Sequence, residues 1–200
     1  MKFAVSFTFL ALTVTTSAAP VRRDVSTIET VINVVSNAAD ALGSAVSSFS
    51  GSPSLLTVVP LTVALTALTG AVTAATPVVL ASAKLNTADS DIIVSDVTAL
   101  ASHMDAAFTP LQAARPEFDS LLVSPFVITT GTELGGLQAV MVPFQDALSS
   151  ITSPASADDT FKGHITDDHI GQPGALAIDF DSINNPITAA LNAFGLDLGL

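Results

Sequence analysis

The stretch from Ala41 to Ala83 contains no charged residue, which limits what this chain can fold into more than any other feature. Its centre, from Val59 to Val79, consists mostly of Leu, Val, Ala and Thr. A stretch of this kind crosses a membrane, packs inside a helical bundle, or contacts a hydrophobic surface outside the cell. The remaining sequence has to decide among these three.

The chain as a whole is both apolar and acidic. Of its 200 residues 49% are hydrophobic, and 18 Asp and Glu outweigh 6 Lys and Arg to give a net charge of −12. The length suits one domain with a single core. The lack of basic residues excludes nucleic acid as a partner, because phosphate binding needs clustered Lys and Arg. The absence of cysteine excludes disulfides and thiol nucleophiles, and the absence of Trp and Tyr argues against a sugar-stacking surface.

The N-terminus predicts export from the cell. Residues 1–19 have one basic residue, an apolar run and then small residues, as a secretory signal peptide does. Residues 20–23 form a short segment that ends in Arg22 and Arg23, which is either a dibasic processing site or a solvated basic pair. We expect a secreted, extracellular protein. Association with the cell wall is a further hypothesis. No transmembrane or lipid anchor is expected at the C-terminus, because the short tail carries Asp197.

Apolar residues recur at spacings of three and four in five segments, which predicts an all-α antiparallel bundle of four to five helices. The five apolar seams run from Val25 to Phe49, Leu61 to Val79, Ile93 to Ala114, Leu134 to Ile151 and Leu176 to Phe194. Residues 24–151 are expected to form the bundle core. Residues 152–174 lose this period and predict a long acidic loop, and residues 175–200 the last helix and tail.

The second segment carries three stripes at helical spacing, one of Leu and Val, one of Ala and one of Thr. Pro60 suits the first turn of a helix, and Pro77 is expected to end or kink it. The helix between them would be about 25 Å long, short of a membrane core of about 30 Å. We therefore predict a bundle helix with an outer face of hydroxyl groups. The threonines of that face are our surface-binding candidates: Thr62, Thr66, Thr69, Thr73 and Thr76.

The sequence holds no catalytic motif, so we expect no enzyme and no cofactor. The closest approach to a site is the segment from His164 to His169, where two histidines flank Asp167 and Asp168. Because this segment lacks the helical spacing that would pre-form a metal site, we interpret it as a solvated acidic loop. His103, in the third helical segment, is expected to point outward or to lie at the boundary between core and surface.

Two segments resemble the fungal hydrophobic surface-binding protein A family: RRDVSTIETVINVVSNAADALGSAVSSF (Arg22 to Phe49) and SDIIVSDVTALASHMDAAFTPLQAARPEF (Ser90 to Phe118). The step from Arg115 to Phe118 is part of the second match, and the helix from Leu137 to Ser150 is similar to the fourth helix of that family. The resemblance implies a secreted helical bundle without catalysis, which adsorbs to hydrophobic surfaces and assists recruitment of hydrolytic enzymes. The family is related to cell-wall galactomannoprotein antigens, which look like lipid carriers, so the resemblance also implies a fatty acid held in an apolar cavity between bundle helices.

Three functions stay open at this point. The leading hypothesis is a secreted binder of hydrophobic surfaces. The second is a fatty-acid or lipid carrier, and the third is a structural protein of the cell wall. For the carrier, large apolar side chains are the candidates to line a dry cavity, and the alternative for each of them is ordinary packing in the core: Leu65, Leu68, Val97, Met104, Met141 and Phe144.

Overall fold

The computed structural model describes residues 25–120, 124–152 and 180–194, and these residues form six helices and no strand. The prediction of an all-α bundle is confirmed. In chain order, the helices are α1 (Val25–Gly51), α2 (Leu55–Leu80), α3 (Thr87–Ala113), α4 (Arg115–Ser120), α5 (Ser124–Ile151) and α6 (Asp181–Ala193). The predicted signal peptide at 1–19, the segment at 20–23 and nearly all of the acidic loop at 152–174 lie outside the described residues.

The four long helices bury the predicted seams. Ile28, Leu42 and Phe49 of α1 are fully buried, as are Ile93, Leu100 and Met104 of α3. The seam of α5 from Leu134 to Ile151 is buried along its length. Glycines and prolines within these helices do not break them, because the apolar face packs along the whole helix and outweighs the local cost.

The second helix is longer than the sequence predicts. It begins at Leu55, where the Ser54 hydroxyl caps the N-terminus by accepting a hydrogen bond from the Thr57 amide, and the Ser54 amide in turn donates to the Thr57 hydroxyl. Pro60 therefore lies in the second turn, and the helix continues through Pro77 to Leu80. At about 1.5 Å per residue, 26 residues span about 39 Å. Our argument that this helix is too short for a membrane was wrong, because the capping box at Ser54 went unrecognised.

Among the helices that the structure describes, α2 alone is long and apolar enough to cross a membrane. Its packing gives a better reason than its length to place it in a bundle. The seam from Leu61 to Val79 is buried, and α2 packs against α1 on one side and α5 on the other. Both neighbours carry acidic residues, including Asp40 on α1 and Asp146 on α5.

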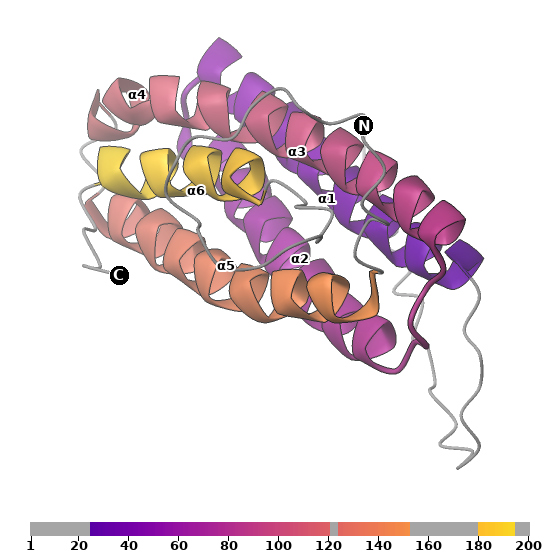
Figure 1. Ribbon diagram of the computed structural model, residues 1–200. Coiled ribbons are helices and arrows are strands. Elements are labelled where there is room, and N and C mark those ends of the chain that lie inside the picture. The colour runs from indigo at the N-terminus through magenta and orange to yellow at the C-terminus, as the bar shows by residue number, and fades with distance from the viewer. Residues whose placement is uncertain (1–24, 121–123, 153–179, 195–200) are drawn as a thin grey trace, which may run out of the picture.

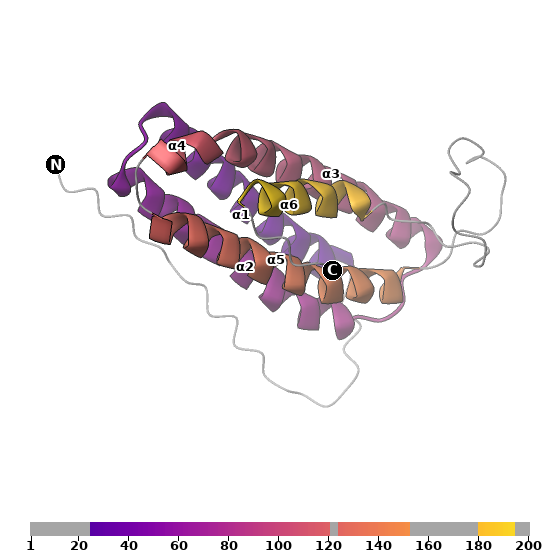
Figure 2. The same cartoon turned by 90° about the vertical axis from the view of Figure 1, so that its left-hand side faces the viewer.

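Consecutive long helices run in opposite directions, but neighbours in space are not always neighbours in sequence (Figures 1 and 2). Around the bundle the order is α3, α1, α2, α5, with α6 lying between α5 and α3. Asp40 contacts His103 and Gly43 lies against Ala107, so α1 and α3 are parallel. A Cβ at position 43 would lie 3.6 Å from the Ala107 Cα, an ordinary van der Waals contact, so the packing of α1 on α3 at this point does not require a glycine. Helix α2 packs on α1 and α5, so the side of α2 that points away from α3 is left uncovered.

Three aromatic rings close the end of the bundle near α4. The Phe118 ring lies 4.3 Å from that of Phe49 and 5.1 Å from that of Phe194, measured between ring centroids. The guanidinium of Arg115 covers Phe194 at 5.3 Å. Phe118 thus packs inward, and its ring connects α4 to Phe49 of α1 and to Phe194 at the end of α6.

Candidate functional site

The outward side of α2 is apolar, and we call it the α2 outer face. Leu56 is 86% exposed, and Val59 and Val63 are each about half exposed, at 51% and 49%. The exposed apolar residues of this face are Leu56, Val59, Val63, Ala67, Ala74 and Leu80. Thr66 and Thr73 are exposed among them. A surface helix normally carries charged residues at such positions, so the α2 outer face is an unusual surface for a water-soluble bundle.

The structure places the five predicted threonines on this face and along its edge. Thr66 and Thr73 are exposed, whereas Thr62, Thr69 and Thr76 are half-buried beside the helix neighbours. Our sequence reasoning missed the exposed Leu and Val residues, although their spacing of three and four from Leu56 to Ala74 was visible. We followed the buried Leu seam and predicted an outer face made of threonine hydroxyls, without the exposed Leu and Val side chains.

The threonine hydroxyls point their protons back at the helix. Thr66 donates to the Thr62 carbonyl at 2.9 Å and Thr73 donates to the Thr69 carbonyl at 2.8 Å. Thr62, Thr69 and Thr76 donate in the same way to carbonyls three or four residues earlier. A hydroxyl bonded in this way has no proton left for an outside partner. The hydroxyl groups of the α2 outer face therefore keep lone pairs for an outside partner but no free proton.

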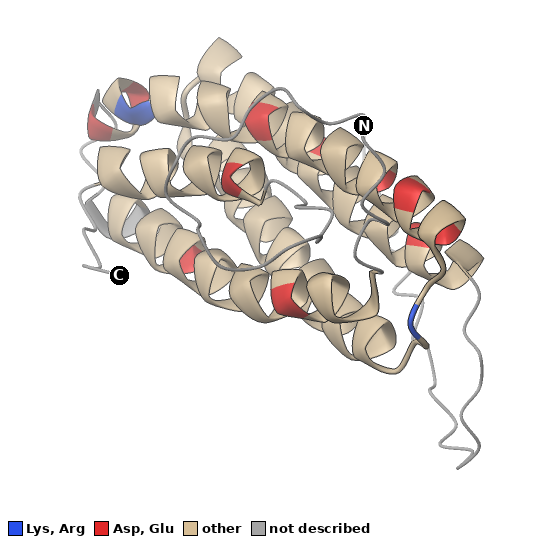
Figure 3. Cartoon of the chain, viewed as in Figure 1, with Lys and Arg blue, Asp and Glu red and all other residues tan. Residues whose placement is uncertain are grey.

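Charge is distributed away from this face (Figure 3). No acidic or basic residue lies on α2, whereas α3 alone carries Asp89, Asp91, Asp96 and Asp105. Because α2 and α3 do not lie side by side in the bundle, the uncharged side and the most acidic side are separated. A contact through α2 would bury no charge, so it avoids the main electrostatic cost of leaving water.

The six predicted cavity residues lie in the continuous core. Leu65, Leu68, Met104, Met141 and Phe144 have no exposed surface, and Val97 is 1% exposed. Their side chains belong to one cluster with the rest of the buried apolar residues. The structure brings them together as packed core, and whether they part to hold a ligand stays a prediction.

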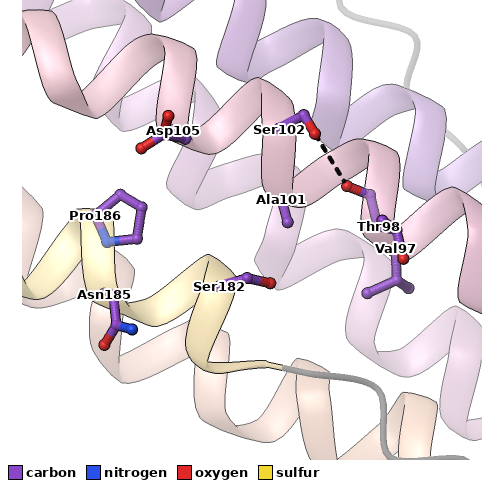
Figure 4. A pocket seen from close by; sticks show the side chains of 8 residues that line it. All are labelled: Val97, Thr98, Ala101, Ser102, Asp105, Ser182, Asn185 and Pro186. Atoms are coloured by element: carbon purple, nitrogen blue, oxygen red, sulfur yellow. Dashed lines mark hydrogen bonds between the residues drawn. The ribbon is translucent and has the colours of Figure 1, made fainter. Parts of the chain in front are cut away.

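A pocket of about 590 Å³ opens elsewhere, between α3 and the first turns of α6 (Figure 4). Of the six predicted cavity residues, Val97 lines it. The lining residues are Val97, Thr98, Ala101, Ser102, Asp105, Ser182, Asn185 and Pro186. This pocket has an apolar floor and a polar rim, and sequence reasoning did not find it because its two walls are some 80 residues apart in the chain.

The histidines do not form a site in the described part of the chain. His103 Nδ1 lies 2.6 Å from Asp40 Oδ1, so this histidine links α3 to α1 at the boundary position that we predicted. Within residues 25–120, 124–152 and 180–194, no three His, Asp or Glu side chains lie close enough to hold a metal ion. His164 and His169 lie outside those ranges.

Comparison with known proteins agrees with this geometry. The family described as "Hydrophobic surface binding protein A" matches residues 25–150, which is more than half of the chain. The chain belongs to the hydrophobic surface-binding protein A family. The match covers α1 to α5, including all of the α2 outer face. Members of this family are described as binding proteins, in keeping with the absence of a catalytic motif from the sequence.

One solved structure shares the fold. It is the crystal structure of AfMP4p, an Aspergillus protein, in complex with palmitic acid. The TM-score is 0.61 at 19% sequence identity, and the match covers 86% of this chain and 95% of AfMP4p. No curated protein matches this chain in sequence.

Proposed function

We propose that this chain is a secreted, non-catalytic protein that adsorbs to hydrophobic surfaces through the α2 outer face. The observation that carries the proposal is the uncharged α2 helix, whose exposed positions hold Leu, Val and Ala and whose threonine hydroxyls bond to their own helix. Membership in the hydrophobic surface-binding protein A family supports it. Secretion rests on the signal peptide that residues 1–19 predict.

The size of the face is sufficient for adsorption. A helix about 39 Å long and about 10 Å wide offers about 400 Å² to a flat surface. At about 25 cal/mol per Å² this contact gains about 10 kcal/mol, before the several kcal/mol lost in immobilising the protein. The same area falls below the roughly 800 Å² per partner of a typical stable protein interface, so it favours an extended apolar surface over a tight dimer.

Replacing Thr66 and Thr73 by Glu tests the contact. Both residues are exposed, so the bundle should remain helical by circular dichroism. The two added carboxylates must either lose their water on contact, which costs free energy, or stay hydrated and hold the face away from the surface. We therefore expect adsorption to polystyrene or paraffin beads to fall at least about tenfold. Full adsorption by this variant would contradict the assignment of the α2 outer face.

Two further variants sharpen this test. Ser95→Glu with Thr109→Glu adds the same charge to exposed positions of α3, away from α2, and should leave adsorption near the wild-type level. Thr66→Val with Thr73→Val removes both hydroxyls and keeps the shape. Because those hydroxyl protons are already bonded to carbonyls, we expect adsorption to stay the same or rise. A large loss would mean that the hydroxyls themselves are recognised.

The orientation of the bundle suits the recruitment of a secreted hydrolase. When α2 lies on a surface, α3 faces away from it, because α1 and α5 are the neighbours of α2. The acidic side is then open to the solvent. Recruitment is tested by adding a hydrolase to coated beads and measuring bound activity with and without the protein.

A fatty-acid carrier is the second candidate, favoured by the palmitic acid in AfMP4p, whose fold this chain shares. The ligand would have to part the core around Met104 and Met141, which are flexible side chains suited to repacking. Native mass spectrometry of the secreted protein decides this point. A co-purified fatty acid supports the carrier, and protein that stays empty after incubation with palmitate contradicts it.

A further inference from the structure

The pocket between α3 and α6 lies apart from the α2 outer face, and its chemistry differs. Its volume of about 590 Å³ is in the range of small-molecule sites, which run from about 300 to 1,000 Å³. Val97, Ala101 and Pro186 are buried and form an apolar floor. Figure 4 shows the remaining side chains around this floor, with Asp105 and Asn185 on facing helices.

The polar groups of the pocket rim on α3 can accept hydrogen bonds from a ligand, but their own protons already donate to the helix. Thr98 Oγ1 donates to the Val94 carbonyl at 2.8 Å, and Ser102 Oγ donates to the Thr98 carbonyl at 3.3 Å. With their protons committed, these two hydroxyls offer only lone pairs to a ligand.

Asp105 adds to this character. Its carboxylate accepts one bond from Thr109 at 3.0 Å on Oδ1, and two oxygens accept more than one bond. Across the pocket Pro186 has no amide proton, while the Asn185 side chain provides both a donor and an acceptor. The α3 rim therefore presents three acceptors, one of them charged, to whatever enters the pocket.

We propose that this pocket binds the hydroxyl-bearing head of a neutral amphiphile of the monoacylglycerol type. The hydroxyls of the head donate to Asp105, Thr98 and Ser102, and the first carbons of its chain cover Val97, Ala101 and Pro186. A fatty-acid carboxylate brings more acceptors and a negative charge to Asp105, on a chain with a net charge of −12. The site thus selects the neutral lipid over the anion of the same chain length.

The test compares two probes, monodecanoylglycerol and decanoate, each titrated into the full secreted protein at neutral pH and below its micellar concentration. Isothermal titration calorimetry should give an affinity at least about tenfold higher for monodecanoylglycerol. A tenfold change is the scale expected when the decanoate carboxylate faces an acceptor of the pocket and neither has a proton to donate. Asp105→Asn supplies an amide donor and removes the charge, and should reduce this preference to about threefold or less. Asp91→Asn, at an exposed position of the same helix that does not line the pocket, should preserve it.

Ser102→Leu tests the position of the ligand. Residue 102 is exposed, so folding is not at risk, and the larger side chain should occlude the pocket and weaken both probes. The pair Thr66→Glu and Thr73→Glu should bind monodecanoylglycerol as the wild type does, which separates this site from the surface contact. Equal affinity for the two probes, a preference that Asp105→Asn leaves intact, or no binding of monodecanoylglycerol would overturn the proposal.

Discussion

Single residues decide how polar the α2 outer face is. A threonine on a helix is commonly counted as polar, yet the side chain is half methyl group, and its hydroxyl bonds to the preceding turn when it can. In α2 all five predicted threonines do so, with distances from 2.8 to 3.1 Å. Their hydrogen-bonding protons are thus satisfied within the helix, and the outer face keeps its apolar contact area without exposing unpaired donors.

Asp96 of α3 has surroundings that do not suit a charged carboxylate. Its Oδ2 is buried without a hydrogen-bond partner, and burial raises the pKa of the carboxyl above its ordinary value of 3.8. A raised pKa means that the folded protein binds the proton more tightly than the unfolded chain. The stability that the protonated form provides is therefore present below pH 3.8 and is lost as the pH rises through the higher folded pKa.

We expect Asp96→Ala to stabilise the protein at pH 7 relative to Asp91→Ala, an exposed change on the same helix that corrects for helix propensity. Removing a buried unpaired oxygen is worth about 1 kcal/mol, or a rise of about 2–4 °C in Tm. At pH 3 the difference between the variants should shrink. Thermal unfolding followed by circular dichroism at both pH values measures it, and a difference that grows at pH 3 would contradict the sign.

At the scale of the element, the capping of α2 sets how much apolar surface is displayed. Ser54 and Thr57 bond to each other's backbone amides, so that the helix starts five residues before Pro60. These added residues include Leu55 and Leu56, the latter the most exposed of the large apolar side chains described. The cap therefore contributes both to stability and to the area of the contact face.

Ser54→Ala should cost about 1 kcal/mol, because one side-chain acceptor for the helix N-terminus is lost. Urea unfolding followed by circular dichroism measures this change, and Ser54→Asp should keep most of the stability, since aspartate also caps helices. Ser52→Ala, at an exposed position before the cap, is the matched control. Equal midpoints for Ser54→Ala and Ser52→Ala would show that the capping box is dispensable.

At the scale of the whole molecule, α6 is joined to the bundle differently from the long helices. Gln112 donates to the Pro186 carbonyl at 3.2 Å, Arg115 donates to the Ala193 carbonyl at 3.0 Å, and Gln138 donates to the Thr188 hydroxyl at 3.2 Å. Gln145 and Asn184 exchange two amide bonds, at 2.9 and 3.2 Å. These polar contacts frame the apolar side of α6, which includes Ile183 and Ile187.

The amide pair should behave as one unit. Gln145→Leu leaves the Asn184 amide without its partner, and Asn184→Leu does the same to Gln145, so each should cost about 1–3 kcal/mol. The double variant restores an apolar contact, and we expect it to recover at least about 1 kcal/mol of the summed loss. Urea unfolding of the four proteins gives this coupling energy, and strictly additive losses would show that the two amides do not depend on each other.

The sequence by itself determined the helices and their buried seams. Periods of three and four are local, so residues such as Ile28, Met104 and Phe144 were assigned to the core without any knowledge of their partners. The family resemblance also came from sequence, because it rests on the order and spacing of the same seams. The start of α2 was within reach as well, since Ser54 and Thr57 form a recognisable capping pair.

Only the tertiary structure decided which surface is left uncovered and where a pocket opens. The Leu seam of α2 was readable from the sequence, but the other sides of this helix also lack charge, so the sequence did not say which of them α1 and α5 would leave exposed. That choice follows from the combined packing of all the helices, which buries the Leu seam and leaves Leu56, Val59 and Val63 outside. The pocket at Asp105 and Asn185 likewise exists only because α6 returns to pack beside α3. Contacts between residues so far apart in the chain depend on the energy of the whole fold, which no local pattern contains.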